Sequence, residues 1–124
     1  MTWSADTAIA PVGSIGAALT DIGSVIDMSA AQYTWVQIGV RNDGTGTISD
    51  QILVGAYATL DGVTFDDVPF QEFRITGSAS LLYRPWIIRD AWQFQIKAKV
   101  IGAEGTASGI SDSYTVGGSY RTFS

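Results

Sequence analysis

The chain has 124 residues, of which 46% are hydrophobic and 15% are charged, and its mean hydropathy is +0.19. This length suits a single domain with one core, and the hydrophobic content excludes a disordered chain. The net charge is −5 and the seven Lys and Arg residues form no run, so we expect neither nucleic acid nor an anionic membrane surface as a partner. The chain contains no cysteine and no histidine, which excludes disulfides, thiolate metal sites and both Ser-His-Asp and Cys-His catalysis.

The N-terminal segment contains Trp3 and Pro11 and has no clear periodicity. We therefore predict an extended arm over residues 1–13 and a β-sandwich domain over residues 14–124. No cationic start precedes an apolar run, and glycines and a proline interrupt the apolar residues 8–19. We expect no signal peptide and no membrane span, and hence synthesis in the cytoplasm.

Residues 14–20 and 21–27 echo one another with a period of seven. This spacing suits either one amphipathic helix or two short strands. Each interior glycine would cost a helix about 1 kcal/mol, and the rest of the chain is rich in β-forming residues. We therefore predict strands.

Four later segments alternate in the manner of half-buried strands, namely residues 33–41, 51–60, 70–76 and 92–100. In the last of these, Gln93, Gln95, Lys97 and Lys99 are predicted to face outward. The apolar phase of the three clearest strands predicts a core made of Val36, Ile38, Val40, Ile52, Val54, Ala56, Trp92, Phe94, Ile96 and Val100.

The remaining elements are shorter. Residues 81–88 form a further strand candidate, and Pro85 places it at a sheet edge or at a bulge because proline cannot donate to a strand ladder. Residues 102–109 are predicted to form a loop, and residues 112–116 and 120–123 two short strands around Gly117-Gly118. About seven short strands predict an all-β, antiparallel sandwich or barrel.

The carboxylates that come closest to a catalytic or metal-binding pattern are Asp61, Asp66 and Asp67. Asp66 and Asp67 are adjacent and would point to opposite faces of an extended chain, whereas a glycosidase needs two carboxyl groups facing each other. Calcium binding is the better alternative, but no segment has EF-hand spacing. We predict a solvated hairpin turn at Asp61-Gly62 and no catalytic, cofactor-binding or metal-binding residues.

The four tryptophans are the candidates for partner contact. Trp92 is in phase with the apolar face and is assigned to the core, whereas Trp35 lies opposite the aliphatic face and either belongs to a second layer or is exposed. Trp3 and Trp86 suit contact and core equally. Because Trp, Tyr and Arg dominate interface hot spots, the predicted partner-binding residues are Trp3, Tyr83, Arg84 and Trp86.

Two stretches carry a first resemblance. Residues 25–38, VIDMSAAQYTWVQI, followed by residues 57–65, YATLDGVTF, resemble the discoidin or galactose-binding family, in which an Ile-Asp strand start precedes a hairpin with Asp-Gly. The match covers about a third of the chain, and Thr59-Leu60 replace the usual Ser before Asp-Gly. The resemblance implies a jelly-roll sandwich more than sugar binding.

The character of the whole chain is also similar to that of small virion proteins of tailed phages, in particular capsid decoration or cement proteins. The shared features are length, acidity, absence of Cys and His, strands rich in small residues, and Asp-Gly hairpins. This resemblance implies a non-enzymatic virion subunit that binds the major capsid protein or other virion proteins, with a homotrimer favoured. A neck or tail component is an alternative within the same class.

Two other classes of function stay open. A carbohydrate-binding module would need an exposed aromatic platform beside polar groups, which Trp86 with Arg84 and Arg89 could supply. A small glycan-active enzyme is the third candidate.

Overall fold

The computed structural model describes residues 2–43, 48, 50–76, 81–89, 92–101 and 113–124. Within these residues the chain forms strands and no helix, so no described segment is a helix that could cross a membrane. The strands are β1 (Thr7–Ile15), β2 (Thr20–Asp27), β3 (Tyr33–Asn42), β4 (Gln51–Thr59), β5 (Gln71–Ile75), β6 (Leu81–Ile88), β7 (Gln93–Ile101) and β8 (Tyr114–Phe123).

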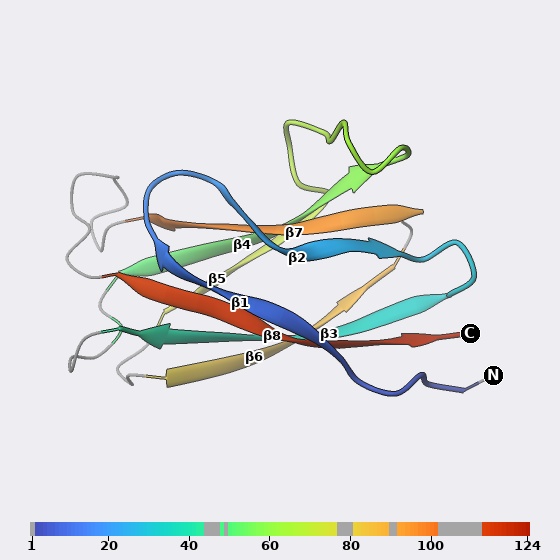
Figure 1. The fold of residues 1–124 in the computed structure, drawn as a ribbon, viewed down its shortest axis with the longest axis horizontal. Helices are drawn as coiled ribbons and strands as arrows, with labels where there is room; N and C mark the ends of the chain where they lie inside the picture. Colours follow the sequence, from blue (N-terminus) through green and yellow to red (C-terminus); the bar gives the residue numbers. More distant parts are fainter. Residues whose placement is uncertain (1, 44–47, 49, 77–80, 90–91, 102–112) are drawn as a thin grey trace.

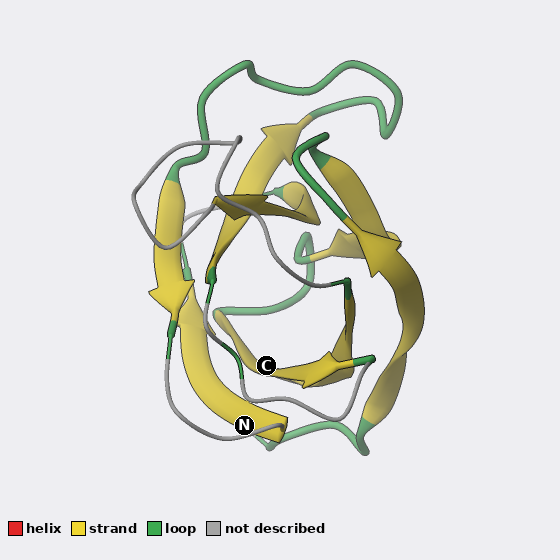
Figure 2. Ribbon diagram, turned by 90° about the vertical axis from the view of Figure 1, so that its left-hand side faces the viewer, coloured by secondary structure: helices red, strands yellow, loops and turns green. Residues whose placement is uncertain are grey.

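The strands build two four-stranded antiparallel sheets that pack face to face (Figures 1 and 2). Sheet A has the order β1-β8-β3-β6 and sheet B the order β2-β7-β4-β5. The predicted all-β antiparallel sandwich is therefore confirmed. The strands predicted for residues 14–27 are also confirmed, since this segment contains the end of β1 and all of β2.

The pairing is nested along the chain. β1 pairs with β8, β2 with β7, β3 with β6, and β4 with β5. Two further pairings, β3 with β8 and β4 with β7, join these pairs into the two sheets. The first and last segments therefore lie side by side, and both chain ends meet at one end of the sandwich (Figure 1).

Alternation of apolar residues fills the space between the sheets. Every predicted core residue except Trp92 is buried, and the long aliphatic side chains of both sheets meet there. The wider core also contains Ile9, Ile15, Ile22, Ile26, Met28, Ile48, Ile75, Ile88, Ala98, Tyr114 and Val116.

The assignment of Trp92 to the core is wrong. Its side chain is 57% exposed, and β7 begins one residue later at Gln93. Leu60, which alternation over residues 51–60 predicts on the same side as Ile52 and Val54, is 83% exposed because β4 ends at Thr59. Alternation determines the direction of a side chain only within the paired strand, and beyond its end no opposing sheet covers the residue.

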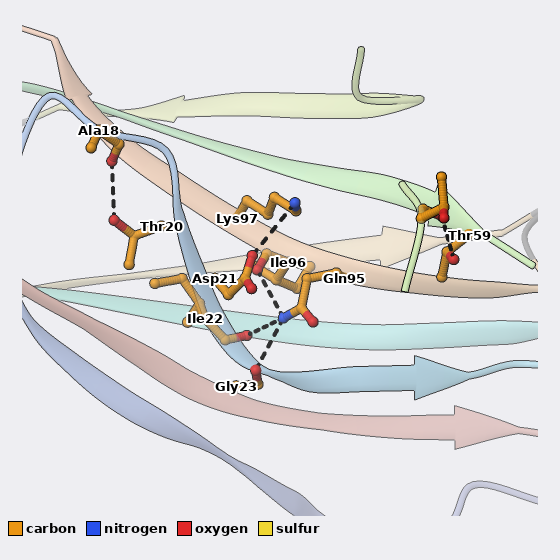
Figure 3. A network of polar contacts seen from close by, with 10 residues as sticks. Ala18, Thr20, Asp21, Ile22, Gly23, Thr59, Gln95, Ile96 and Lys97 are labelled. Carbon is orange, nitrogen blue, oxygen red and sulfur yellow. Dashed lines mark hydrogen bonds and ion pairs between the residues drawn. The ribbon is translucent and has the colours of Figure 1, made fainter. Parts of the chain in front are cut away.

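Gln95 is a second departure, because it was expected to face solvent and is buried. Its amide nitrogen lies 3.3 Å from the Ile22 carbonyl oxygen and 3.1 Å from the Gly23 carbonyl oxygen (Figure 3). The register of β2 against β7 shifts between Ile22 and Ile26, and Gly23 has φ +74°. The amide nitrogen of Gln95 thus donates to backbone carbonyl oxygens at an irregular part of β2.

The predicted N-terminal arm is shorter in the structure than in the sequence analysis. Residues 7–13 belong to β1, where Ile9 is part of the core. Two register shifts separate Ile9, Val12 and Ile15, so the inward residues recur every third position and the usual period of two is hidden. Even Thr2 and Ser4 pair with the chain's own C-terminal strand, through hydrogen bonds from their backbone nitrogens to the Ser124 and Thr122 oxygens.

Strand β6 lies at the edge of sheet A, as Pro85 predicted. The two terminal strands expected around Gly117-Gly118 are one continuous strand, β8. The loop predicted for residues 102–109, and Asp112, lie outside the described residues.

Candidate interaction face

The outer face of sheet A is the candidate functional site. Val36, Ile38 and Val40 of β3 point into the core, so the residues between them point away from it. The register of β3 against β6 and β8 places their outward residues in continuous cross-strand rows. From β6 through β3 to β8 these rows are Ile87–Trp35–Arg121, Pro85–Gln37–Ser119, Tyr83–Gly39–Gly117 and Leu81–Arg41–Thr115.

One end of this face carries an aromatic–arginine cluster, which consists of Trp3, Tyr33, Trp35, Arg89, Arg121 and Phe123. The Trp3 and Phe123 rings have centroids 5.1 Å apart. The Arg121 guanidinium lies 5.2 Å from the Trp35 ring and that of Arg89 lies 5.4 Å from the Tyr33 ring. Such cation–π pairs hold flat side chains in place at the surface, so this end presents ordered rings and cations.

The other end is hollowed by glycines, and we call it the glycine groove. It is a shallow depression of about 450 Å³ whose lining includes Pro11, Gly39, Leu81, Tyr83 and Gly117. A Cβ atom at Gly39 would lie 2.6 Å from the Tyr83 ring, and one at Gly117 would lie 2.9 Å from the Pro11 Cα. The two glycines therefore let Tyr83 of the edge strand β6 and Pro11 of the edge strand β1 pack closely against β3 and β8.

Large apolar side chains are exposed on this face along the edge strand β6 and at Trp3. Trp3, Leu81, Tyr83 and Ile87 are between 38% and 53% exposed, whereas Trp35 of the neighbouring strand β3 is half-buried. Single exposed apolar residues are ordinary, but several on one sheet face indicate an interaction surface.

The sheet edges are less suited to binding than this face. β6 contains Pro85, and β5 is only five residues long. β1 contains Pro11 and two register shifts, and β2 is interrupted by the shift after Ile22. Prolines, irregularities and short lengths hinder the addition of another strand, so contact through the face of sheet A is favoured over strand addition.

The structure separates the four predicted partner-binding residues. Trp3 and Tyr83 lie on the outer face of sheet A, at its two ends. Trp86 and Arg84 are paired with the inward-facing Val36 and Ile38. Trp86 packs against the core and against the Phe73 ring, with centroids 4.8 Å apart. Of the two interpretations left open for Trp86, the structure supports the core.

Sequence reasoning missed the contribution of Arg121, Phe123 and the glycines to this face. A signal was present for the glycines, because Gly39 is in phase with Trp35 and Gln37 in the alternation of β3. The part of Arg121 depends on β8 lying beside β3, a pairing between segments about 85 residues apart that no local pattern specifies.

Of the three candidate carboxylates, that of Asp61 stabilises a turn. Asp61 Oδ1 accepts hydrogen bonds from the backbone nitrogens of Thr64 and Val63, each at 2.8 Å. These bonds lower the pKa of Asp61 to about 2, and the bond from the Thr64 nitrogen has the largest effect. Within the described residues no three acidic side chains gather in a way that could hold a metal ion. That the chain has no catalytic residue, cofactor or metal stays a prediction.

No family model, curated protein or solved structure matches the chain. The phage and discoidin resemblances therefore stay hypotheses, and the functional argument depends on the molecule's own surfaces.

Proposed function

We propose that the chain is a non-enzymatic structural subunit that acts by protein–protein contact through the outer face of sheet A. The observation that carries this proposal is the exposure of four large apolar residues on that face, namely Trp3, Leu81, Tyr83 and Ile87. Aromatic and Arg side chains are enriched among residues that contribute most to protein interfaces. The first partner that we propose is a second copy of the chain, in a homotrimer.

We further propose that this subunit belongs to a tailed-phage virion and decorates the capsid through contact with the major capsid protein. The nested strand pairing supports this proposal. A chain folded as one long hairpin, with β4 and β5 at its tip, and then rolled up produces this pairing. That arrangement is how a jelly roll is built, and jelly rolls are frequent among viral capsid and lectin domains.

The sugar site considered for Trp86, Arg84 and Arg89 is less well supported. Trp86 packs against Phe73 and the core and offers no open ring for stacking. Arg89 lies over the Tyr33 ring on the opposite side of sheet A. The three side chains do not form one platform.

The test is the molar mass of the chain in solution, measured by size-exclusion chromatography with light scattering. We expect the wild-type protein to form a homo-oligomer and the triple variant Trp35→Ser, Tyr83→Ser, Ile87→Ser to be a folded monomer. The matched control is Leu60→Ser, Val63→Ser, Val68→Ser, which removes three apolar residues that are more exposed than those of the face. Contact through sheet A would be contradicted if the wild-type protein were a monomer. It would also be contradicted if both variants had the same reduced molar mass relative to the wild-type protein.

The virion proposal needs its own test. Purified protein is mixed with empty capsids of the phage whose genome encodes the chain, and the capsids are sedimented. We expect the wild-type protein and the control variant Leu60→Ser, Val63→Ser, Val68→Ser to sediment with the capsids. The variant Trp35→Ser, Tyr83→Ser, Ile87→Ser should remain in the supernatant. Failure of the wild-type protein to sediment, with its oligomer intact, would refute capsid decoration and leave self-association standing.

A further inference from the structure

A second hollow lies at the end of sheet B, away from the face of sheet A. It has a volume of about 490 Å³, and we call it the loop-end hollow. Its lining comes from the end of β4, from the loop that follows it and from the start of β7, which lie at the same end of the sandwich (Figure 1). The lining residues are Ala58, Thr59, Leu60, Asp61, Thr64, Phe65, Asp66, Trp92 and Gln93.

The wall formed by residues 59–64 is held rigidly by its own hydrogen bonds. Thr59 Oγ1 donates to the Thr64 carbonyl oxygen at 2.6 Å and accepts from the Gly62 nitrogen at 3.0 Å. Asp61 Oδ1 accepts from the Val63 and Thr64 nitrogens. A site whose wall is already ordered loses little conformational entropy when a ligand binds.

Trp92 supplies an open aromatic ring at this hollow. Its side chain is 57% exposed, although its backbone is fixed by a hydrogen bond of 2.8 Å from the Met28 nitrogen to the Trp92 oxygen. The other ring in the lining, Phe65, already has the Lys97 ammonium 4.5 Å from its centroid. Phe65 is also half-buried, so Trp92 is the more exposed of the two rings in the lining.

Polar groups surround this ring. Asp61 and Asp66 are exposed carboxylates, and Gln93 and Thr64 add an amide and a hydroxyl to the same lining. The hydrogen bonds from the Val63 and Thr64 nitrogens to Asp61 both end on Oδ1. Carboxylate and amide groups beside an apolar ring accept and donate hydrogen bonds at fixed positions.

We propose that the loop-end hollow binds a neutral saccharide, with one sugar ring on Trp92. A pyranose ring has an apolar C–H face that packs on an aromatic side chain and hydroxyl groups at its edge that bond to carboxylates and amides. Two carboxylates in the lining disfavour sialylated or uronic sugars, since like charges repel. A quaternary ammonium ligand would need a cage of several rings, and Phe65 is engaged by Lys97.

The test uses a glycan array of neutral and sialylated oligosaccharides, followed by calorimetric titration with the neutral glycan that gives the strongest signal. We expect binding to neutral glycans, a loss of at least about tenfold in affinity for Trp92→Ala, and recovery of most of the affinity in Trp92→Phe. Asp66→Asn should weaken binding less than Trp92→Ala. Val68→Ala is the control, because Val68 is exposed on the same loop but does not line the hollow.

Several outcomes would overturn this proposal. They are binding to no neutral glycan on the array, a preference for sialylated glycans, or an affinity that Trp92→Ala leaves unchanged. Choline chloride is titrated in parallel, and binding of choline without binding of a neutral glycan would assign the hollow to cations instead. None of these results bears on the contact through sheet A, since Trp92 lies outside that face.

Discussion

The two sheets have similar inner faces but very different outer faces. The outer face of sheet B is partly covered by the chain itself, because Pro69 of the loop after β4 packs close to Gly55 and Tyr57 is buried. The Lys97 ammonium lies 3.5 Å from the Asp21 carboxylate (Figure 3). It also lies 4.5 Å from the centroid of the Phe65 ring. The outer face of sheet A has no comparable covering among the described residues, and it exposes aromatic rings, apolar side chains and a glycine groove.

The outer faces of the two sheets therefore have different roles, one in stability of the monomer and one in association. On sheet B, a segment of the same chain covers some of the outward side chains, so this part of the face contributes to the stability of the monomer. On sheet A, the Tyr33 and Trp35 rings lie beside arginines and remain partly exposed. A face that is ordered before binding and left open to solvent favours association, because little entropy remains to be lost.

The largest expected effect compares two aromatic residues that are two positions apart. Phe94 is fully buried between the sheets, and Phe94→Ala should lower the free energy of unfolding by about 3–5 kcal/mol through lost burial and a cavity. Trp92→Ala should cost less than about 1 kcal/mol, as at ordinary surface sites. Urea unfolding of both variants measures the difference. Equal losses would mean that Trp92 is packed in the core.

A smaller effect is expected on the covered face. Gln95→Ala removes the donor that bonds the Ile22 and Gly23 carbonyl oxygens, and should destabilise the protein by about 1–3 kcal/mol. Gln93→Ala, on the same side of β7 but only half-buried, serves as the control and should be near neutral. If both substitutions are neutral in urea unfolding, water replaces the amide and the interior of this face is not closed.

On the open face, a substitution should separate folding from association. A methyl group at Gly39 would meet the Tyr83 ring, which is exposed and can swing outward. Gly39→Ala should therefore change the melting temperature little but weaken self-association by displacing Tyr83 from the groove. Sedimentation velocity over a concentration series measures the association constant. A large fall in melting temperature with unchanged association would show that the groove matters for folding alone.

The smallest effect concerns the turn at Asp61 and its dependence on pH. Since the pKa of Asp61 is lowered from 3.8 to about 2 in the folded chain, its ionised form stabilises the turn above about pH 4, and this contribution is lost as the pH falls toward 2. Asp61→Asn should therefore melt at a lower temperature than wild type at pH 7, and the difference should shrink by pH 2. A difference that is constant across this range would contradict the assignment.

Strand positions and most of the core could be predicted because period-two alternation is a local property. It identified β3, β4, β5 and β7 and the inward direction of residues such as Ile38 and Phe94. It failed where the register shifts, as in β1, where Ile9, Val12 and Ile15 recur every third residue. It also failed at Trp92, because the sequence does not mark where pairing ends.

The candidate face could be predicted only in part, for a different reason. Trp3 and Tyr83 were found because their residue types favour contact. Arg121 and Gly117 join them through the pairing of β8 with β3, and the inward direction of Trp86 depends on the register of β6 against β3. Both are long-range features of the sheet, and a residue type alone carries no information about them.

Hydroxyl-radical footprinting with mass spectrometry tests directly the claim that sheet A associates through its outer face while the end of sheet B does not. The rates of oxidation of Trp35, Tyr83 and Trp92 are compared at a dilution that gives monomers and at a concentration that gives oligomers. We expect Trp35 and Tyr83 to be oxidised several times more slowly in the oligomer and Trp92 to react at the same rate in both. Protection of Trp92 with no protection of Tyr83 and Trp35 would contradict the claim.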